Sequence, residues 1–501
     1  MRMVKEYFLV LDCGATSVRA VAISPQGEIL AMAAFQNAPK YQEGSAHYLV
    51  WDLEEIWGKL CQATQKVIAS AGREIRAVSV TTFGADGAPV RANGSLTYPV
   101  ISWQCSRTEQ WARRIVELVN AREIFRITGY QVIPFNTLLK LLWLRENAPE
   151  ALDEARYFLM MPGLFNFKLT GEMTMDYPSA STTMMMDIRS RQWSERLLSL
   201  AGLTPDFFPR MVKSGEIIGT VTKIASEETG IPAGTPVTSA GHDTQFALVG
   251  SLAKDDELIL SSGTWEIAAL RIPYYRDSEV AFTTGMLVEL DAEEGFWNPQ
   301  MLMIAGGVVE WVRRHFFADL KDASDIYERI VEEAASVDPG ADGVLFIPAF
   351  MPSGPLKPYS TKGTILGLGL TTGRAHVARA AFEGLAFQLR QAVEALSEAF
   401  AFRPQRVVVV GGGSRNVLWN RLRADVLNLP VVVTSCEEAT VLGAALFAMV
   451  GTGYAKDLKE AKRNITHTTR VFEPSPERAI YDELYERYVK VPLCLEAYYR
   501  A

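Results

Sequence analysis

The two halves of this chain open with the same pattern: a strand, a polar turn that contains glycine and threonine, and a second strand. In the first half, strands at 7–11 and 18–24 flank the turn Asp12–Ser17. The second half repeats this arrangement around the turn Ser261–Thr264. A pattern that recurs at about half the chain length indicates an internal duplication, and two such halves would close over a ligand bound between them.

The chain is also too long for one hydrophobic core, because it has 501 residues. We predict an α/β protein with an N-terminal domain over 1–250 and a C-terminal domain over 251–501. Residues 107–203 read mostly as helix, interrupted by a short strand at 157–161, and we expect them to shape a binding face. Periodicity predicts these further elements: strands at 28–34, 76–82, 344–348, 406–410 and 431–434, and helices at 52–71, 304–317, 324–335, 374–400, 439–450 and 476–499, the last interrupted at Pro492.

Composition excludes several classes of protein. A net charge of −8 argues against a nucleic acid or an anionic membrane as partner. The five cysteines are scattered without a Cys-x-x-Cys pair, which is typical of a reduced, cytoplasmic protein. The five histidines are too far apart to predict a metal site. We expect neither a signal peptide nor a transmembrane segment.

The two turns are candidate phosphate sites. In the first turn, Gly14 allows close approach of a phosphate, Thr16 offers a hydroxyl, and Asp12 could hold Mg²⁺ through water. Arg19 follows this turn and is a further candidate for binding the phosphate. The second turn offers Ser262, Gly263 and Thr264, which would grip the transferring group from the other side. The alternative interpretation is that both are ordinary hairpin turns. For the first turn, a phosphate site and an ordinary turn have about equal weight.

A third glycine-rich turn, Gly411–Asn416, follows four valines and precedes a helix. Its candidate residues for a base or a phosphate are Gly411, Gly412, Ser414 and Asn416. The pattern is neither Gly-x-Gly-x-x-Gly nor a Walker A motif. A plain strand-to-helix turn remains the alternative.

Asp243 lies between an apolar run and a helix-like run, near the middle of the chain. A carboxylate at that position could act as the general base of phosphoryl transfer, where positioning and electrostatics supply most of the catalysis. The alternative is a helix N-cap, which Asp favours in any case. His242 is expected to support the site rather than to exchange protons with the substrate.

Sugars bind through aromatic faces and planar polar side chains. The candidates of this kind are the run Phe83–Asp86 together with Trp103, Gln104, Arg107, Phe135 and Asn136, with Asp86 and Trp103 preferred. Any of them could equally be a structural residue.

Taken together, these residues resemble the FGGY carbohydrate kinase family over nearly the whole chain. Two long matches are specific, Phe135–Asn147 and the pair Gly363–Leu368 with His376–Glu383. The resemblance implies an actin/hexokinase-like (ribonuclease H-like) fold with an interdomain cleft, and it implies ATP and Mg²⁺. It also makes Asp243 the catalytic aspartate and places Gly307 near the nucleotide. Cys13 and Ala15 depart from the residues that relatives often carry, but the backbone donors survive that change.

Within the family, the chain most resembles the members that phosphorylate L-fuculose at the primary hydroxyl of its first carbon. This resemblance rests on residues 10–16, 80–87, 101–103, 239–248 and 260–267. The substrate-binding residues implied are Asp86, Trp103, Gln104, Asn136, His242 and Asp243. The alternatives are L-rhamnulose, xylulose, ribulose or an autoinducer as substrate, or a non-catalytic nucleotide-binding protein on the same fold. The resemblance is compatible with a homodimer.

Overall fold

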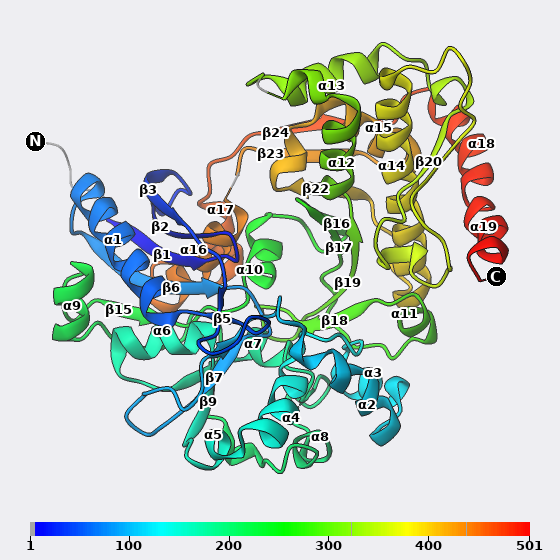
Figure 1. The fold of residues 1–501 in the computed structure, drawn as a ribbon. Helices are drawn as coiled ribbons and strands as arrows, with labels where there is room; N and C mark the ends of the chain where they lie inside the picture. The colour runs from blue at the N-terminus through cyan, green and yellow to red at the C-terminus, as the bar shows by residue number, and fades with distance from the viewer. Residues whose placement is uncertain (1–5, 322, 437, 501) are drawn as a thin grey trace, which may run out of the picture.

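The computed structural model describes residues 6–321, 323–436 and 438–500, and it contains two large sheets with helices packed around them (Figure 1). The N-terminal residues 1–5 therefore lie outside the described part. The first sheet has the strand order β14-β15-β6-β1-β2-β3 and the second has β18-β19-β17-β16-β22-β23-β24. Their bounds are Tyr7–Cys13 (β1), Ser17–Ile23 (β2), Ile29–Gln36 (β3), Ile75–Thr82 (β6), Ile217–Thr220 (β14), Pro236–Thr238 (β15), Glu257–Ser262 (β16), Trp265–Ala269 (β17), Leu287–Leu290 (β18), Trp297–Ile304 (β19), Arg406–Val410 (β22), Val431–Thr434 (β23) and Thr469–Phe472 (β24).

The two sheets share one topology. In the first, β1, β2 and β3 form an antiparallel meander, and β6 and β15 continue the sheet in parallel with β1. In the second, β16, β17 and β19 form the meander, and β22 and β23 continue it in parallel. The corresponding connection in each half is the glycine-containing turn between the first two strands, so the repeated sequence pattern reflects a repeated fold.

Strands β18 and β19 were not predicted. The first half of β19 reads Trp297-Asn-Pro-Gln300, which neither alternates nor forms an apolar run. β18 has only four residues and carries a buried acid, Glu289. Both strands form because they are covered by the other half of the chain: the Val288 amide donates to the Gly129 carbonyl at 2.8 Å, and the Trp297 indole donates to the Ile188 carbonyl at 2.9 Å.

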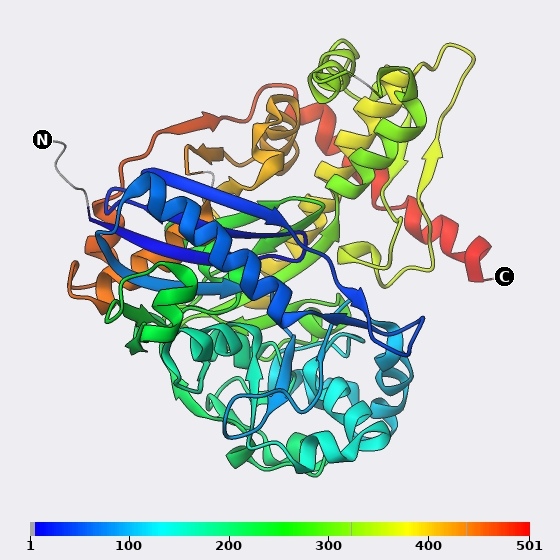
Figure 2. The same cartoon turned by 60° about the vertical axis from the view of Figure 1, so that its left-hand side comes forward.

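The segment between β8 (Val100–Ile101) and β13 (Arg210–Val212) is the lower lobe in Figures 1 and 2. It is largely helical, as predicted, but also contains short strand pairs. Its elements are α2 (Glu109–Leu118), α3 (Ala121–Thr128), α4 (Thr137–Asn147), α5 (Pro149–Asp153), β9 (Tyr157–Met160), α6 (Met161–Thr170), β10 (Thr174–Asp176), α7 (Tyr177–Ser181), β11 (Met186–Asp187), β12 (Gln192–Trp193) and α8 (Glu195–Ser199).

Helices cover both faces of the first sheet. Helix α1 (Leu53–Ala71) packs on the face that carries Leu9 and Leu11, and it lies across β1 to β3 in Figure 2. The opposite face, with Phe8 and Val10, is covered by α10 (Asp243–Gly250) and α16 (Ala439–Gly451). Helix α16 thus comes from the C-terminal part of the chain but completes the core of the N-terminal sheet.

Helices α10 and α16 cross at two glycines. A Cβ at Gly250 would lie 1.9 Å from the Ala439 carbonyl oxygen, and a Cβ at Gly443 would lie 1.9 Å from the Phe246 carbonyl oxygen. Both contacts are with backbone, which cannot rotate away as a side chain can. The two helix backbones therefore touch directly, and only glycine fits at the crossing.

The second sheet packs against α14 (Arg374–Phe400), whose bounds agree with the prediction, and against α15 (Val417–Leu427) beside it. Helices α12 (Gly306–Phe316) and α13 (Ile326–Ala335) and the antiparallel pair β20 (Leu345–Ile347) and β21 (Thr364–Leu366) pack on α14. The C-terminal helix is divided into α18 (Arg478–Tyr488) and α19 (Val491–Arg500). The break precedes Pro492 instead of falling on it, because proline is tolerated in the first turn of a helix.

No helix within the described residues is long and apolar enough to cross a membrane. All five cysteines are free thiols.

The helix crossing predicts a stability effect. Gly443→Ala should destabilise the protein by about 1–3 kcal/mol, because the added methyl group forces the two backbones apart. Gly58→Ala is the matched control, since Gly58 lies inside α1 and a methyl group added there would have no atom within 4 Å. That substitution should stabilise by about 0.5–1 kcal/mol. Denaturant unfolding of both variants measures the difference, and a Gly443→Ala protein as stable as the wild type would contradict the crossing.

Candidate active site

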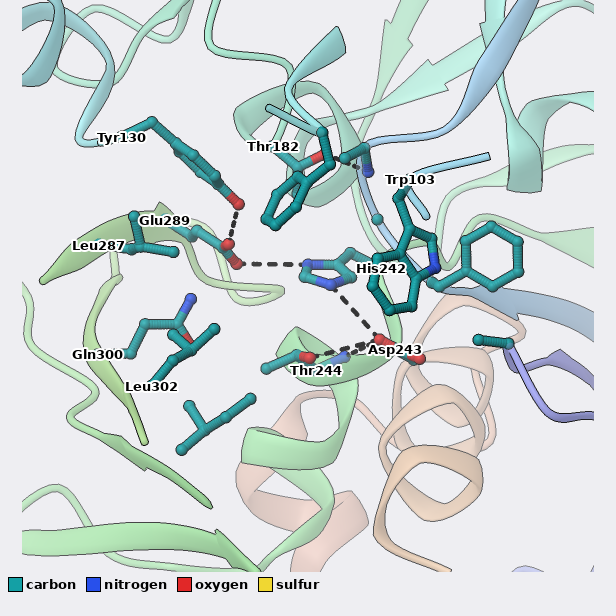
Figure 3. A pocket seen from close by; sticks show the side chains of 16 residues that line it. Trp103, Tyr130, Thr182, His242, Asp243, Thr244, Leu287, Glu289, Gln300 and Leu302 are labelled. Atoms are coloured by element: carbon teal, nitrogen blue, oxygen red, sulfur yellow. Dashed lines mark hydrogen bonds and ion pairs between the residues drawn. The ribbon is translucent and has the colours of Figure 1, made fainter. Parts of the chain in front are cut away.

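A cavity of about 230 Å³ lies between the two halves, at the N-terminus of α10. Figure 3 shows the side chains that line it. They come from the β1–β2 turn, the segment after β6, the helical lobe, the start of α10 and strands β17 to β19. The lining residues are Ala15, Phe83, Gly84, Ala85, Trp103, Tyr130, Phe135, Thr182, His242, Asp243, Thr244, Ile267, Leu287, Glu289, Gln300 and Leu302. A cavity of this size suits a compact molecule.

Asp243 is the first residue of α10, and its carboxylate faces the cavity. Its Oδ1 accepts a hydrogen bond from the Thr244 amide at 2.7 Å. The N-cap position belongs to His242, which makes no side-chain capping bond, so the alternative that Asp243 is an N-cap is wrong. The carboxylate instead lies one residue inside the helix, where the helix dipole favours a negative charge.

A chain of ionisable groups leads away from Asp243. Its Oδ1 lies 3.4 Å from His242 Nε2, and His242 Nδ1 lies 3.3 Å from Glu289 Oε2. Glu289 is almost completely buried and accepts hydrogen bonds from the Tyr130 hydroxyl and the Gln245 side-chain amide. The chain joins β18 of the second half to α10 and the helical lobe of the first.

These groups shift one another's pKa values. Burial alone would lower the pKa of His242, but Glu289, Asp243 and Asp176 outweigh burial and raise it to about 9. Burial raises the pKa of Asp243 to about 6; the His242 charge opposes this rise and Asp12 adds to it. Burial would also raise the pKa of Glu289, yet His242 and the hydrogen bonds hold it below its usual range. At neutral pH, His242 is therefore a cation between two carboxylates.

The first predicted phosphate turn lies beside this cavity. Asp12 is buried and accepts hydrogen bonds from Arg19 at 2.5 Å and from the Thr81 hydroxyl at 2.9 Å. Among the described residues, the Ala15 and Thr16 amides donate to no acceptor. Gly14 is held by its own amide, which donates to the Ser17 carbonyl at 2.8 Å. Two free amides on a tight turn suit an anionic group.

The second turn also offers a free donor. The Thr264 amide has no acceptor among the described residues, and Gly263 and Thr264 are exposed. Ser262 differs, because it is fully buried and its hydroxyl donates to Glu266 at 2.9 Å and accepts from Arg423 at 2.7 Å. Its side chain therefore supports the turn and does not face a ligand.

The third turn packs directly on the second. A Cβ at Gly413 would lie 2.0 Å from the Ser262 hydroxyl oxygen, and the Gly307 amide donates to the Thr264 carbonyl at 3.1 Å. The structure thus brings together the second turn, the start of α12 and the exposed Gly411 and Gly412. Two of the predicted nucleotide residues have structural partners there. Ser414 Oγ donates to the Gly411 carbonyl at 2.7 Å, and Asn416 caps α15 by accepting from the Trp419 amide at 2.9 Å.

The predicted sugar residues divide into two groups. Trp103, Phe135 and His242 line the cavity, whereas Gln104 is exposed outside it and Arg107 lies buried against Tyr48 and Trp143.

Asp86 and Asn136 are not among the residues that line the cavity, and both are completely buried. One oxygen of Asp86 binds Lys140, and the other accepts from the Trp51 indole at 2.6 Å and the Trp103 amide at 2.9 Å. Asn136 Oδ1 accepts from the Ile133 amide at 2.8 Å. The Asp86 carboxylate therefore positions the backbone of Trp103, and Asn136 positions the turn that precedes Phe135.

Sequence reasoning missed the cavity residues Tyr130, Thr182, Leu287, Glu289, Gln300 and Leu302. Glu289 could have been found from the sequence, because it is the one charged residue in the apolar run 286–290. The others follow no local pattern.

The donor set fits a magnesium–nucleotide complex. Within the described residues, no group of three or more His, Cys, Asp or Glu side chains could hold a metal ion. Mg²⁺ binds to proteins through one or two carboxylates and completes its shell with water and substrate phosphates. Asp12 lies close enough to Asp243 to raise its pKa, so a carboxylate is available beside the free amides.

Two family models and several known proteins match this chain. The model of the N-terminal domain of the FGGY family of carbohydrate kinases matches residues 7–250, and the model of the C-terminal domain matches 258–452. The chain is 40% identical over 483 residues to the L-fuculokinase of Escherichia coli K12, covering 96% of this chain and all of that protein. It is 26% identical to the autoinducer-2 kinase of Klebsiella pneumoniae subsp. pneumoniae, covering 97% of this chain and 93% of that one.

Solved structures share the fold at lower identity. The xylulose kinase of Rhodospirillum rubrum superposes with a TM-score of 0.87 at 21% identity, covering 99% of this chain and 100% of that one. The glycerol kinase of Plasmodium falciparum with ADP gives a TM-score of 0.86 at 21% identity, covering 98% of both chains. The predicted fold class, two duplicated actin-like α/β domains, is confirmed.

The ion-pair chain predicts the titration of His242. Its imidazole should titrate near pH 9, and Glu289→Gln should lower that midpoint toward the ordinary value of about 6.5, because the raising charge is removed. Histidine-selective NMR measures the titration midpoint in the wild type and in Glu289→Gln. The His242 signal is identified as the one that disappears in His242→Asn. Glu294→Gln, an exposed carboxylate on the following loop, is the control and should change nothing. A wild-type midpoint near 6.5 would contradict the charge arrangement.

Proposed function

Because the chain belongs to the FGGY family of carbohydrate kinases, we propose that it phosphorylates L-fuculose on the primary hydroxyl of its first carbon, giving L-fuculose 1-phosphate. As a member of this family, the protein is an ATP-dependent phosphotransferase. The choice of L-fuculose rests on the 40% identity to an L-fuculokinase over that protein's full length. The autoinducer-2 kinases are more distant, at 26–27% identity.

Asp243 is the general base in this proposal. The sugar hydroxyl gives its proton to the Asp243 carboxylate while its oxygen bonds to the γ-phosphorus, and the bond from that phosphorus to the bridging oxygen of ADP breaks. The Thr244 amide holds the carboxylate in place, and the His242 cation favours its ionised form. A weak base is sufficient because proton transfer occurs late in phosphoryl transfer.

The turns around the cavity would bind the nucleotide. The free amides of Ala15, Thr16 and Thr264 suit phosphate oxygens, Gly411 and Gly412 would approach the adenosine, and Asp12 would hold Mg²⁺. When bound, Mg²⁺ neutralises negative charge on the phosphates. Closing the two halves over the cavity would exclude water and so suppress hydrolysis of ATP.

The free thiols support a reducing, cytoplasmic location for this reaction. A homodimer is compatible with the proposal, and light scattering of the purified protein measures it.

Replacing the base tests the mechanism. Asp243→Asn should lower sugar-dependent turnover by about 10²–10⁴-fold or more, while nucleotide affinity stays similar. Asp457→Asn is the matched control: Asp457 is an exposed N-cap of α17 (Leu458–Arg463), and asparagine caps equally well, so activity should be retained. A coupled assay of ATP consumption and calorimetric binding of ADP measure the two effects. Substantial residual turnover in Asp243→Asn would overturn the assignment of the base.

A panel of ketoses tests the substrate. We expect the highest kcat/KM with L-fuculose and lower values with L-rhamnulose, xylulose, ribulose and the autoinducer. A higher value for another sugar would reassign the substrate within the family. Tight nucleotide binding with no turnover of any sugar would instead favour a non-catalytic nucleotide-binding protein.

A further inference from the structure

One wall of the cavity is a single face of the second sheet. Ile267 of β17 pairs with Leu302 of β19, and Leu287 of β18 pairs with Gln300 of β19. Alternate residues of a strand point to the same side of a sheet, so Gln300 and Leu302 share a face. Figure 3 shows Leu287, Gln300 and Leu302 together on one side of the cavity, opposite Trp103. Glu289 lies on the same side of β18 as Leu287, but its carboxylate is engaged by Tyr130, Gln245 and His242. The remainder of this wall is hydrocarbon apart from the Gln300 amide.

Most of the other polar groups around the cavity already bind each other. Thr182 Oγ1 accepts from the Ala85 amide at 2.9 Å and donates to the Ser179 carbonyl at 2.8 Å. Tyr130 donates its hydroxyl hydrogen to Glu289, whose other oxygen faces His242. The groups left to bind sugar hydroxyls are therefore concentrated at the start of α10, around Asp243, and at Gln300.

Gln300 has an unsatisfied acceptor. The side chain is 2% exposed, and its Oε1 is buried without a hydrogen-bond partner among the described residues. Buried amide oxygens are nearly always bonded, and leaving one unbonded is costly. A hydroxyl of a molecule in the cavity would satisfy this oxygen.

We propose that the face formed by Ile267, Leu287, Gln300 and Leu302 selects a ketose that ends in a methyl group. Gln300 Oε1 accepts a hydrogen bond from one sugar hydroxyl, and the three aliphatic side chains contact the methyl group at the end of the sugar opposite the reacting hydroxyl. The proposed substrate, L-fuculose, is a 6-deoxyketose of this kind, and the inference assigns the residues that recognise its methyl group. This inference rests on the proposed function, because it concerns the sugar in the same cavity.

The physical reason is the difference between a methyl and a hydroxymethyl group on this wall. A methyl group gains from burial against hydrocarbon. A hydroxyl in its place would lose its water and find no partner among the aliphatic side chains. An apolar pocket rejects an added hydroxyl by roughly 10- to 100-fold in kcat/KM. The hydrocarbon wall therefore favours the deoxy sugar without excluding its hydroxylated analogue.

A matched pair of sugars tests this on the wild-type protein. L-fuculose and L-tagatose have the same configuration at every carbon and differ only in the methyl or hydroxymethyl group at C6. We expect kcat/KM to favour L-fuculose by about 10- to 100-fold. Equal values for the two sugars, or a preference for L-tagatose, would overturn the inference.

Substitutions assign the preference to the wall. Leu302→Ser should reduce the ratio of kcat/KM for L-fuculose to kcat/KM for L-tagatose by about tenfold, because the new hydroxyl binds the C6 hydroxyl of L-tagatose.

Gln300→Leu should raise KM for L-fuculose by about tenfold or more, while the affinity for ADP, measured by calorimetry, stays unchanged. Val471→Ser is the control for Leu302→Ser, because Val471 is 41% exposed on β24, at the opposite edge of the same sheet. The ratio of kcat/KM for the two sugars in this variant should equal that of the wild type. A Leu302→Ser ratio equal to the wild type would contradict the assigned wall.

Failure of the inference and failure of the proposed function are distinguishable. If no ketose is phosphorylated, the proposed function fails, and the relative binding of L-fuculose and L-tagatose by calorimetry still decides the inference. If L-fuculose is phosphorylated but L-tagatose is used equally well, only the inference fails.

Discussion

The direct backbone contact between α10 and α16 is the constraint on which the rest of the structure depends. It closes the core of the first sheet with a helix from the C-terminal part of the chain, and it fixes the axis of α10. Asp243 is the first residue of that helix, so its position is set by the crossing at Gly250 and Gly443 rather than by its own local turn. A catalytic carboxylate needs such fixed positioning, because small displacements of reacting groups are costly.

The charge balance at the start of α10 depends in turn on the second half of the chain. Glu289 of β18 is buried with two hydrogen-bond donors and keeps His242 protonated. The His242 cation then opposes the rise that burial and Asp12 impose on the pKa of Asp243. The pKa of Asp243, in the N-terminal half, therefore depends on a carboxylate from the C-terminal half, and this arrangement exists only when the two halves are packed together.

The sequence allowed prediction of the features that have local signatures. The paired hairpins, the helix 374–400 and the position of Asp243 follow from turn residues and periodicity, and the structure contains them. The cavity wall could not be predicted, because β18 is only four residues long with an acid inside it, and β19 begins with polar residues and Pro299. Both strands form where the helical lobe covers them. The sequence also could not show that Asp86 pairs with Lys140 below the surface, because a buried carboxylate and one that faces a ligand look alike in sequence.

The cavity has walls from both halves, and this couples ligand binding to their relative position. Asp243 and the first glycine-containing turn belong to the N-terminal half, whereas Gln300 and the second such turn belong to the strands of the second sheet. A sugar that satisfies Gln300 Oε1 and approaches Asp243 contacts both halves at once, so its binding energy favours their closed arrangement. In the proposed reaction, such closure would bring the two turns toward each other, so that the sugar would promote phosphoryl transfer without contacting the nucleotide turns itself.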